Sequence, residues 1–372
     1  MKVLHVYSGN LFGGIESMLL ACARVPVDAS RIEHEFALCF DERLASELRA
    51  AGRPVHLLGP VRMSRPVSAH AARQALVAVL REGRHDRVIC HAPWSQAIFG
   101  GVVTRTGTPL VFWAHDRMTG RHWTERIARH VRPQLVVCNS RFTDATKASL
   151  YPGIRSVVVY PPVPAVRPAR ERRYVRMSLD TPEPAVVIVQ ASRCEAWKGH
   201  RVLLEALASV KDVPGWIWWL AGGAQRPDEA VFLASLRRQA EEAGIDDRIR
   251  WLGQRADVPT LLGAADIYCQ ANVDPEPFGI AFVEALSAGL PAVAAGHGGV
   301  TEILDPSCGL LVPPRDPSAL AVALRSLIVD ESRRRALAGA APERAAALCD
   351  PLTQVRCLAA ALESTSPLEM AG

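Results

Sequence analysis

Two glutamates and two basic side chains in the second half of the sequence are of types that bind hydroxyl groups and phosphates. Arg193 and Lys198 follow an apolar run, where both could neutralise a diphosphate. Glu276 stands in a proline-bounded loop after another such run, and Glu284 lies in an otherwise apolar stretch. A carboxylate there needs a polar partner, and a ribose diol suits it. Simpler alternatives are solvated basic side chains, a salt bridge for Glu284 and a helix cap for Glu276.

The first half of the sequence offers two further features. Gly13 and Gly14 follow the first apolar run and open a helix-like stretch, where backbone amides and a helix N-terminus could meet an anion. A plain tight turn fits them equally well. Residues 1–35 lack both GxGxxG and a suitably placed acidic ribose ligand, which excludes an NAD-dependent dehydrogenase. His115 follows the apolar run 109–114, and a place at the end of a strand favours a functional role over a structural one.

Alternating apolar runs and amphipathic stretches predict the elements that position these residues. Apolar runs separated by helices indicate parallel sheets covered on both faces. We therefore predict an α/β protein in which two Rossmann-like, doubly wound lobes face a cleft and ligands bind at the carboxyl ends of strands. The expected strands are 2–7, 34–39, 86–90, 109–114, 134–138 and 155–160, then 185–190, 216–221, 248–252, 266–270, 291–295 and 309–312.

Chain length and proline content predict the domain boundaries. A chain of 372 residues suits two domains. Residues 166–184 are rich in Pro and Arg and are predicted to link an N-terminal lobe (1–165) to a C-terminal lobe (185–345). The remainder, 346–372, is predicted to be a helical tail that packs back on the N-terminal lobe.

Composition limits the class of protein. Hydrophobic residues at 49% and charged residues at 22% are typical of a globular chain. No apolar run approaches the roughly 18 residues of a membrane span, and the start is too short for a signal peptide. The nine cysteines form no CxxC pair, which favours a reducing compartment. We therefore expect a cytoplasmic protein.

Charge is unevenly distributed. Basic residues exceed acidic ones in the first half, and the balance reverses in the second. The basic half indicates an anionic partner or peripheral contact with an anionic membrane on its inner face, and a solvated arginine-rich face is equally compatible. No nucleic acid partner is expected.

Taken in order along the chain, these features resemble the family 4 retaining glycosyltransferases, which have the GT-B fold. The resemblance runs from Gly13 to about Arg315 and is most specific over 275–291. It implies that Arg193 and Lys198 hold the diphosphate of a nucleotide-sugar donor. Glu276 would contact sugar hydroxyls and Glu284 the ribose. His115 would bond the primary hydroxyl of the sugar or a backbone carbonyl.

The resemblance extends these roles to further positions. The implied catalytic residues are His115, Glu276, Arg193 and Lys198. The implied donor-binding residues are Gly13, Gly14, Arg193, Lys198, Gly253, Val258, Glu276, Phe278, Gly279, Ile280, Glu284 and Gly299. The acceptor-side residues are expected to be Glu16, Asp116, Arg117 and Trp94. The loop 270–274 and residues Cys194 and Ala196 depart from the family pattern, so the resemblance does not name the sugar.

The expected reaction is transfer of a hexose from a nucleoside-diphosphate sugar, with UDP or GDP as the expected nucleotides. The resemblance implies retention of configuration and no metal or other cofactor. Saccharide, lipid-linked and small natural-product acceptors all fit the sequence. Two alternatives are a nucleotide-sugar 2-epimerase of the same fold and a non-catalytic nucleotide-sugar-binding protein.

Overall fold

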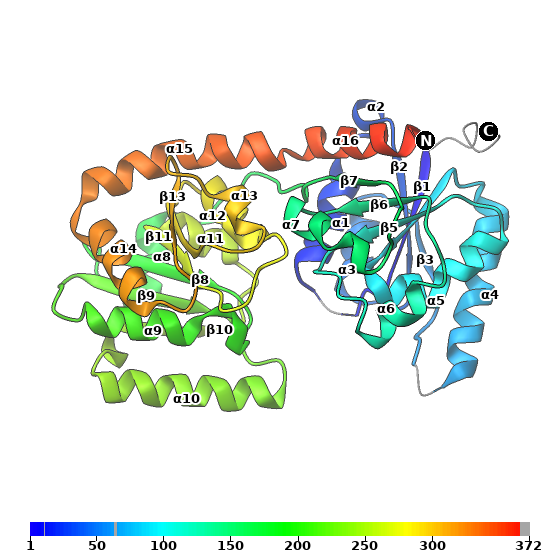
Figure 1. The fold of residues 1–372 in the computed structure, drawn as a ribbon. Coiled ribbons are helices and arrows are strands. Elements are labelled where there is room, and N and C mark those ends of the chain that lie inside the picture. Colours follow the sequence, from blue (N-terminus) through cyan, green and yellow to red (C-terminus); the bar gives the residue numbers. More distant parts are fainter. Residues whose placement is uncertain (11, 63–64, 365–372) are drawn as a thin grey trace. The chain divides into compact units, whose positions relative to one another are not determined.

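The computed structural model describes residues 1–10, 12–62 and 65–364 (Figure 1). The chain forms two compact units: Met1–Pro164 with the segment from Cys349 onward, and Ala165–Leu348. Each unit contains one parallel β-sheet with helices on its faces. The predicted pair of Rossmann-like α/β folds is confirmed.

The sheet of the first unit has the strand order β3-β2-β1-β4-β5-β6-β7. Neighbouring strands are parallel, and the direction of winding reverses between β1 and β4. Such a reversal opens a crevice at the carboxyl ends of the two strands. The short edge strand β3 was not predicted, because three residues are too few to show an alternating pattern. The strands are β1 (Lys2–Tyr7), β2 (Glu33–Leu38), β3 (Val55–Leu57), β4 (Arg87–His91), β5 (Leu110–Ala114), β6 (Leu135–Cys138) and β7 (Ser156–Val158).

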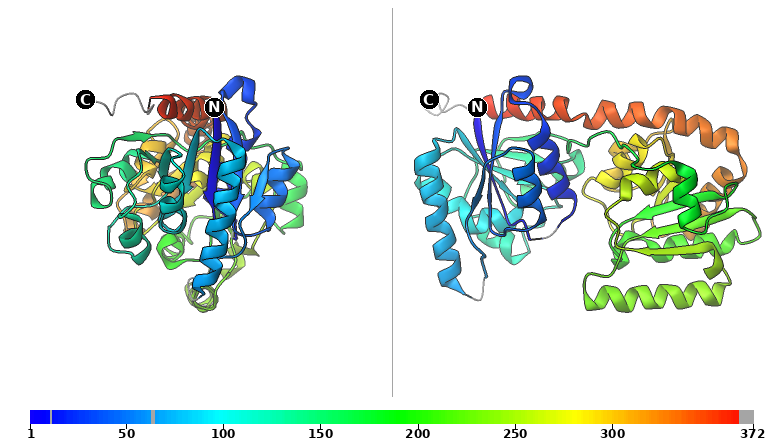
Figure 2. Two further views of the ribbon diagram at one scale, coloured as in Figure 1. Left: turned by 90° about the vertical axis from the view of Figure 1, so that its right-hand side faces the viewer. Right: turned by 180° about the vertical axis from the view of Figure 1, so that it is seen from behind.

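Helices cover both faces of this first sheet. Apolar side chains of α4 and α5 pack on one face in a core that includes Leu76, Phe99 and Val88. The C-terminal helix α16 contacts α1 and α2, and it lies beside α2 in Figure 2. The helices are α1 (Gly14–Arg24), α2 (Val27–Ser30), α3 (Arg43–Ala50), α4 (Pro66–Gly83), α5 (Ala92–Arg105), α6 (Trp123–Ala128), α7 (Arg141–Ala145), the 3₁₀ turn η1 (Lys147–Ser149) and α16 (Pro351–Glu363).

The sheet of the second unit has the order β10-β9-β8-β11-β12-β13, so its winding reverses between β8 and β11. Buried side chains of α9, α10 and α14, among them Leu203, Leu236 and Leu324, pack on one face against Trp218. The strands are β8 (Val186–Ala191), β9 (Trp216–Ala221), β10 (Ile249–Gly253), β11 (Ile267–Gln270), β12 (Ala292–Ala295) and β13 (Gly309–Val312). All six strands start and end within one residue of the predicted positions.

The remaining helices also belong to the second unit, apart from the last residue of α15. They are α8 (Arg172–Ser178), η2 (Ala196–Lys198), α9 (His200–Ser209), α10 (Pro227–Ala243), η3 (Asp246–Arg248), α11 (Val258–Ala264), α12 (Ile280–Ser287), α13 (Val300–Ile303), α14 (Pro317–Val329) and α15 (Glu331–Cys349). Across the described part of the chain, no helix has the length and apolarity needed to cross a bilayer.

The prediction that 166–184 is a linker is wrong, because this segment is built into the second unit. It contains helix α8, which packs on α11. The side chain of Arg176 is fully buried. Its guanidinium donates to the carbonyls of Ala264, Glu183 and Ala185 and pairs with Asp266 at 2.5 Å. A guanidinium can satisfy several acceptors at once, and Arg176 in this way anchors the segment to the second unit.

Arg176→Met should destabilise the second unit by about 3 kcal/mol, because it leaves three carbonyls and part of Asp266 without their donor. Thermal and urea unfolding would measure the loss. The matched control is Arg173→Met on the same helix, where the side chain is 68% exposed and the change should cost little. Equal effects of the two changes would contradict the role given to Arg176.

Candidate functional site

The strongest candidate site lies where the winding of the second sheet reverses. Lys198 ends η2, which follows β8, and Glu276 lies in the loop after β11. Because β8 and β11 are neighbours, their carboxyl ends bring both side chains to one place. Lys198 Nζ lies 2.7 Å from Glu276 Oε2, and both side chains are largely buried. The structure therefore brings these two predicted site residues together.

The carboxylate of Glu276 is held from one side only. Its Oε2 atom also accepts from Asn272 Nδ2 at 2.7 Å, and Gln270 Nε2 lies 3.4 Å away. No hydrogen bond to Oε1 occurs within residues 1–10, 12–62 and 65–364. One oxygen is thus fixed by three donors, while the other can still accept from a ligand hydroxyl. Glu276 is not a helix cap, because α12 is capped by Gly279 without a side-chain bond.

Sequence reasoning missed the polar side chains that orient Glu276. Gln270 donates to Asn272 Oδ1 at 2.9 Å and accepts from the buried Tyr268 hydroxyl at 2.8 Å. On the other strand, Gln190 donates to the backbone carbonyl of Lys198 at 3.0 Å. Gln190 and Gln270 lie near the carboxyl ends of two otherwise apolar strands. Because buried amides need hydrogen-bond partners, their positions could have indicated a polar site there.

Close backbone contacts hold the loops of this site together. Gly199 has φ +76°, and a Cβ atom there would overlap the carbonyl oxygen of Ala271. Gly298 has φ +74° and packs on the backbone of Glu276, to whose carbonyl Gly299 donates at 2.7 Å. Only glycine allows both the left-handed backbone and the close approach. These glycines therefore bring the loops after β8, β11 and β12 within hydrogen-bonding range.

Arg193 lies near this pair but does not join it. Its guanidinium is 2.9 Å from Glu195 Oε1, and its side chain is 40% exposed. Glu195 also accepts from the indole of Trp197, and the Lys198 ammonium lies 3.9 Å from the centre of that ring. Glu195 and Trp197 were not predicted, and they connect the two cations while leaving Arg193 open to an anion.

Glu284 is a half-buried carboxylate in α12. Burial raises its pKa to about 7. No ion pair or hydrogen bond engages it among the residues that the structure describes, so the alternative of a salt bridge is wrong. A carboxyl group left without a protein partner in a buried setting is suited to a ligand hydroxyl.

The other predicted donor-binding residues are spread along the same edge of the sheet. Gly279, with φ +108°, and Ile280 begin α12, and the side chain of Phe278 is buried, so any contact from it to a ligand is through backbone atoms. Gly253 ends β10, which is separated from β8 by one strand, and Val258 is the first residue of α11 and not part of a loop. Ligand contacts of these residues stay predictions.

In the first unit, the predicted residues lie around the reversal between β1 and β4. Gly13 caps α1 and Gly14 begins it. Glu16 is 3% exposed and accepts from the Gly13 amide at 2.9 Å and from the Tyr7 hydroxyl at 2.8 Å. This placement favours shaping of the glycine turn over the acceptor contact predicted for Glu16.

His115 follows β5 and is held by two neighbours. Its Nε2 lies 2.9 Å from His91 Nδ1, and its carbonyl accepts from Asn139 at 3.1 Å. Burial lowers the pKa of His115 to about 3, so the ring is neutral. The predicted acceptor-side residues lie after β4 and β5: Asp116 and Arg117 are exposed, and Trp94 is half-buried beside Phe99.

Comparison with known proteins finds a matching family and several relatives. The model of the family described as Glycosyl transferases group 1 matches residues 172–344. A D-inositol 3-phosphate glycosyltransferase of Salinispora tropica is 30% identical over 72% of this chain and 62% of its own. The phosphatidyl-myo-inositol mannosyltransferase of Mycobacterium leprae is 38% identical over 40% of this chain and 38% of its own. The chain belongs to the group 1 glycosyltransferases. It spans less than two thirds of the length of these curated relatives.

The fold of this group 1 glycosyltransferase also matches solved structures. HepE of Anabaena, crystallised in complex with UDP-glucose, superposes with a TM-score of 0.84 at 25% identity. The match covers 98% of this chain and 100% of HepE. The match supports the GT-B fold over 98% of this chain.

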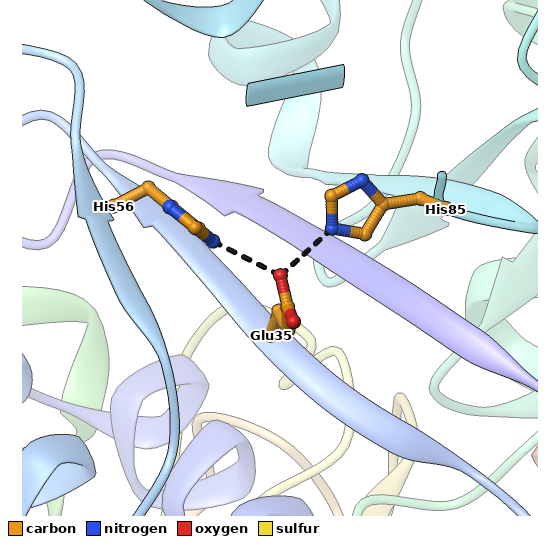
Figure 3. Close-up of side chains that lie close together, drawn as sticks. All are labelled: Glu35, His56 and His85. Atoms are coloured by element: carbon orange, nitrogen blue, oxygen red, sulfur yellow. Dashed lines mark hydrogen bonds and ion pairs between the residues drawn. The ribbon is translucent and has the colours of Figure 1, made fainter. Parts of the chain in front are cut away.

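One cluster in the first unit has the composition of a metal site (Figure 3). Glu35 Oε2 lies 3.0 Å from His56 Nε2 and 2.8 Å from His85 Nε2. Lys2 Nζ lies 2.8 Å from the other oxygen of Glu35. Burial alone would raise the pKa of Glu35, but hydrogen bonds from Lys2, His56 and His85 lower it to about 2.

Proton positions in this cluster favour hydrogen bonding over a metal. A metal on His85 Nε2 would leave the proton on Nδ1, which is buried and has no partner in the described structure. With the proton on Nε2, the buried Nδ1 carries only a lone pair, and Glu35 receives three donors. The adjacent ammonium of Lys2 also disfavours a cation.

Gly199→Ala should displace the loop that carries Lys198 and destabilise the second unit by more than 2 kcal/mol, because the new Cβ meets backbone. Gly289→Ala is the control: Gly289 has φ +81°, but a Cβ there meets no atom within 4 Å. It should cost about 1 kcal/mol. Thermal unfolding of both variants would measure the difference, and equal costs would show that the contact with Ala271 is unimportant.

Proposed function

We propose that the chain is a retaining, metal-independent glycosyltransferase that moves a hexose from a nucleoside-diphosphate sugar to a hydroxyl acceptor. The observation that carries the proposal is the Lys198–Glu276 pair at the reversal between β8 and β11, with one carboxylate oxygen fixed and the other open. A cation beside an open acceptor is what a sugar diphosphate requires.

Each charged group of the second unit has a role in this proposal. Lys198 and Arg193 would compensate the charge that develops on the diphosphate as the bond between sugar and phosphate breaks. Glu276 Oε1 would accept from a sugar hydroxyl, which orients the sugar. Glu284, with a pKa near 7, would bond the ribose diol. Fixed cations would supply the charge that a divalent ion supplies in other enzymes.

The retaining course is proposed as attack on the same face that the leaving group departs from. The acceptor hydroxyl would form the new bond to the sugar carbon as the diphosphate leaves, and a phosphate oxygen of the departing group would take the hydroxyl proton. Glu276 would then not act as a nucleophile, since its Oε1 would accept from a sugar hydroxyl and its Oε2 is committed to Lys198 and Asn272. His115 would contact the sugar as a neutral group.

For the nucleotide and acceptor, the comparisons suggest where to begin. Because HepE was crystallised in complex with UDP-glucose, UDP is the first nucleotide to test. The names of the curated relatives suggest an inositol phosphate or a lipid-linked inositol as acceptor. An anionic acceptor would also fit the basic balance of the first half of the chain.

A thermal-shift panel of UDP, GDP, ADP, dTDP and CMP tests the donor site. One nucleoside diphosphate should raise the Tm by several degrees at 100 times its Kd, a stabilisation of about 2.7 kcal/mol. Lys198→Ala should abolish the shift, because it removes the cation beside the phosphates. The control is Lys211→Ala, an exposed lysine of the same unit, which should keep it. No shift from any nucleotide would refute the proposed donor site.

Product analysis tests the mechanism. With the stabilising nucleotide's hexose donor and an inositol phosphate acceptor, the product should keep the donor's anomeric configuration, as read from proton coupling constants. Turnover should survive excess EDTA, because no step needs a divalent ion. An inverted product, or activity restored only by Mg²⁺ or Mn²⁺, would contradict this mechanism. Conversion of the donor without acceptor would instead indicate a 2-epimerase.

A further inference from the structure

Four histidines of the first unit are hydrogen-bonded in series across the sheet. His34 on β2 contacts His5 on β1, His5 contacts His91 on β4, and His91 contacts His115 after β5. Each of the three nitrogen–nitrogen distances is 2.9 Å. His34, His5 and His91 have no solvent exposure, and only His115 reaches the edge of the unit. The row thus runs from the core to a predicted catalytic residue, and we name it the histidine row.

All four rings of the histidine row are neutral. Burial lowers the pKa of His5 to about 3 and the pKa of His34 and His91 well below the ordinary value. The neighbouring His5 and the charge of Arg53 lower the pKa of His34 further. Aromatic rings enclose the row: Phe36 stacks on His5, Trp113 stacks on His91 and His115, and Tyr7 meets the edge of His91.

Neutral rings impose one direction on the whole row. Each neutral imidazole has one N–H and one lone pair, so a ring that donates to one neighbour must accept from the other. Two arrangements remain. Either every N–H points from His34 toward His115, or every N–H points from His115 toward His34.

The buried end of the row decides between these arrangements. His34 Nε2 is fully buried and has no hydrogen-bond partner in the described structure. If the N–H groups pointed toward His34, this atom would carry a buried, unpaired proton donor. Buried N–H groups without a partner are rarer than buried acceptors without one. The favoured arrangement therefore leaves a lone pair on His34 Nε2 and places the proton of His115 on Nδ1.

A route for protons is a poor account of the same row. A proton that entered at His115 would have to charge a buried ring, which burial disfavours at every position. The far end, His34 Nε2, has no group to receive it. The row is thus suited to fixing a ring and not to moving charge.

The backbone beside the row is strained in a way that fits a positioning role. Ala92, directly after His91, has φ +64°, which is uncommon for a residue with a side chain. It is the first residue of α5, whose cap is His91 itself. The turn thus retains an unfavourable backbone angle directly after His91, the residue that contacts His115.

We propose that His34, His5 and His91 are positioning residues that hold His115 as the neutral tautomer with its proton on Nδ1. His115 then presents a fixed, uncharged hydrogen-bond donor at the carboxyl end of β5. This inference rests on the proposed function for the ligand, a saccharide hydroxyl. An uncharged donor can orient such a hydroxyl without competing with the cations for phosphate.

Nitrogen-15 NMR of the whole protein, labelled at histidine rings, tests the tautomer directly. Correlation spectra distinguish a proton on Nδ1 from one on Nε2, and His115→Gln assigns the signal. The His115 ring should show Nδ1–H and stay neutral from pH 8 to pH 5. A proton on Nε2, or titration near pH 6.5, would overturn the inference. This measurement needs no substrate, so it stands or falls separately from the proposed function.

Changes at the far end of the row test its direction. His34→Asp can only accept when ionised, so it should reverse the row and move the His115 proton to Nε2. Transfer should then fall by about tenfold in kcat, with the KM for the nucleotide donor within about twofold of wild type. His34→Asn can still donate from its amide and should restore both readouts. The control is His70→Asn, an exposed histidine on α4 outside the row.

Each outcome of the variant experiment either supports or refutes the proposed positioning of His115. An unchanged His115 tautomer in folded His34→Asp protein would refute the directional coupling. Equal loss of kcat in His34→Asn and His34→Asp would show that the row is merely structural. If His34→Asp does not fold, the wild-type spectrum and His34→Asn still test the tautomer. If no transfer occurs with any donor while the spectra agree, the proposed function fails and the tautomer assignment survives.

Discussion

The ion pair between Lys198 and Glu276 is the interaction on which the candidate site depends. Burying two opposite charges costs several kcal/mol in lost hydration, and the pair repays this only with good geometry and further hydrogen bonds. Asn272 and Gln270 supply those bonds on one oxygen. The loops must also approach to backbone contact, which explains glycine at position 199. A burial cost that leaves one carboxylate oxygen open is easier to understand as preparation for a ligand than as a source of stability.

The two units share a topology but differ in the chemistry at their reversals. The second unit gathers Lys198, Glu276 and Glu284, whose charges or protonation suit phosphates and diols. The first unit places the neutral imidazoles of His91 and His115 at the carboxyl ends of β4 and β5. Cations bind phosphate most strongly, while neutral donors suit hydroxyl groups. The division agrees with the proposed separation of work between diphosphate and saccharide.

Much of the fold and part of the site could be predicted from the sequence, for identifiable reasons. Long apolar strands and the order of Lys198 and Glu276 behind two of them were enough to place both residues at one sheet edge. The segment 166–184 was misjudged because Arg176 is buried by backbone carbonyls, which have no signature in sequence. The histidine row could not be predicted for a related reason. His5, His34 and His91 lie far apart in the chain, and only the pairing of the strands brings them together.

Proton linkage shows what the histidine row costs. An unfolded histidine binds a proton near pH 6.5, whereas His5 in the folded protein has a pKa of about 3. The folded state is therefore favoured most above pH 6.5, and it loses about 1.4 kcal/mol per pH unit for such a histidine as the pH falls toward 3. Apolar residues at the same positions would avoid this loss and pack as well. A row of buried imidazoles thus lowers the stability of the folded protein at acid pH. Its presence is better explained by a role in holding His115 than by packing of the core.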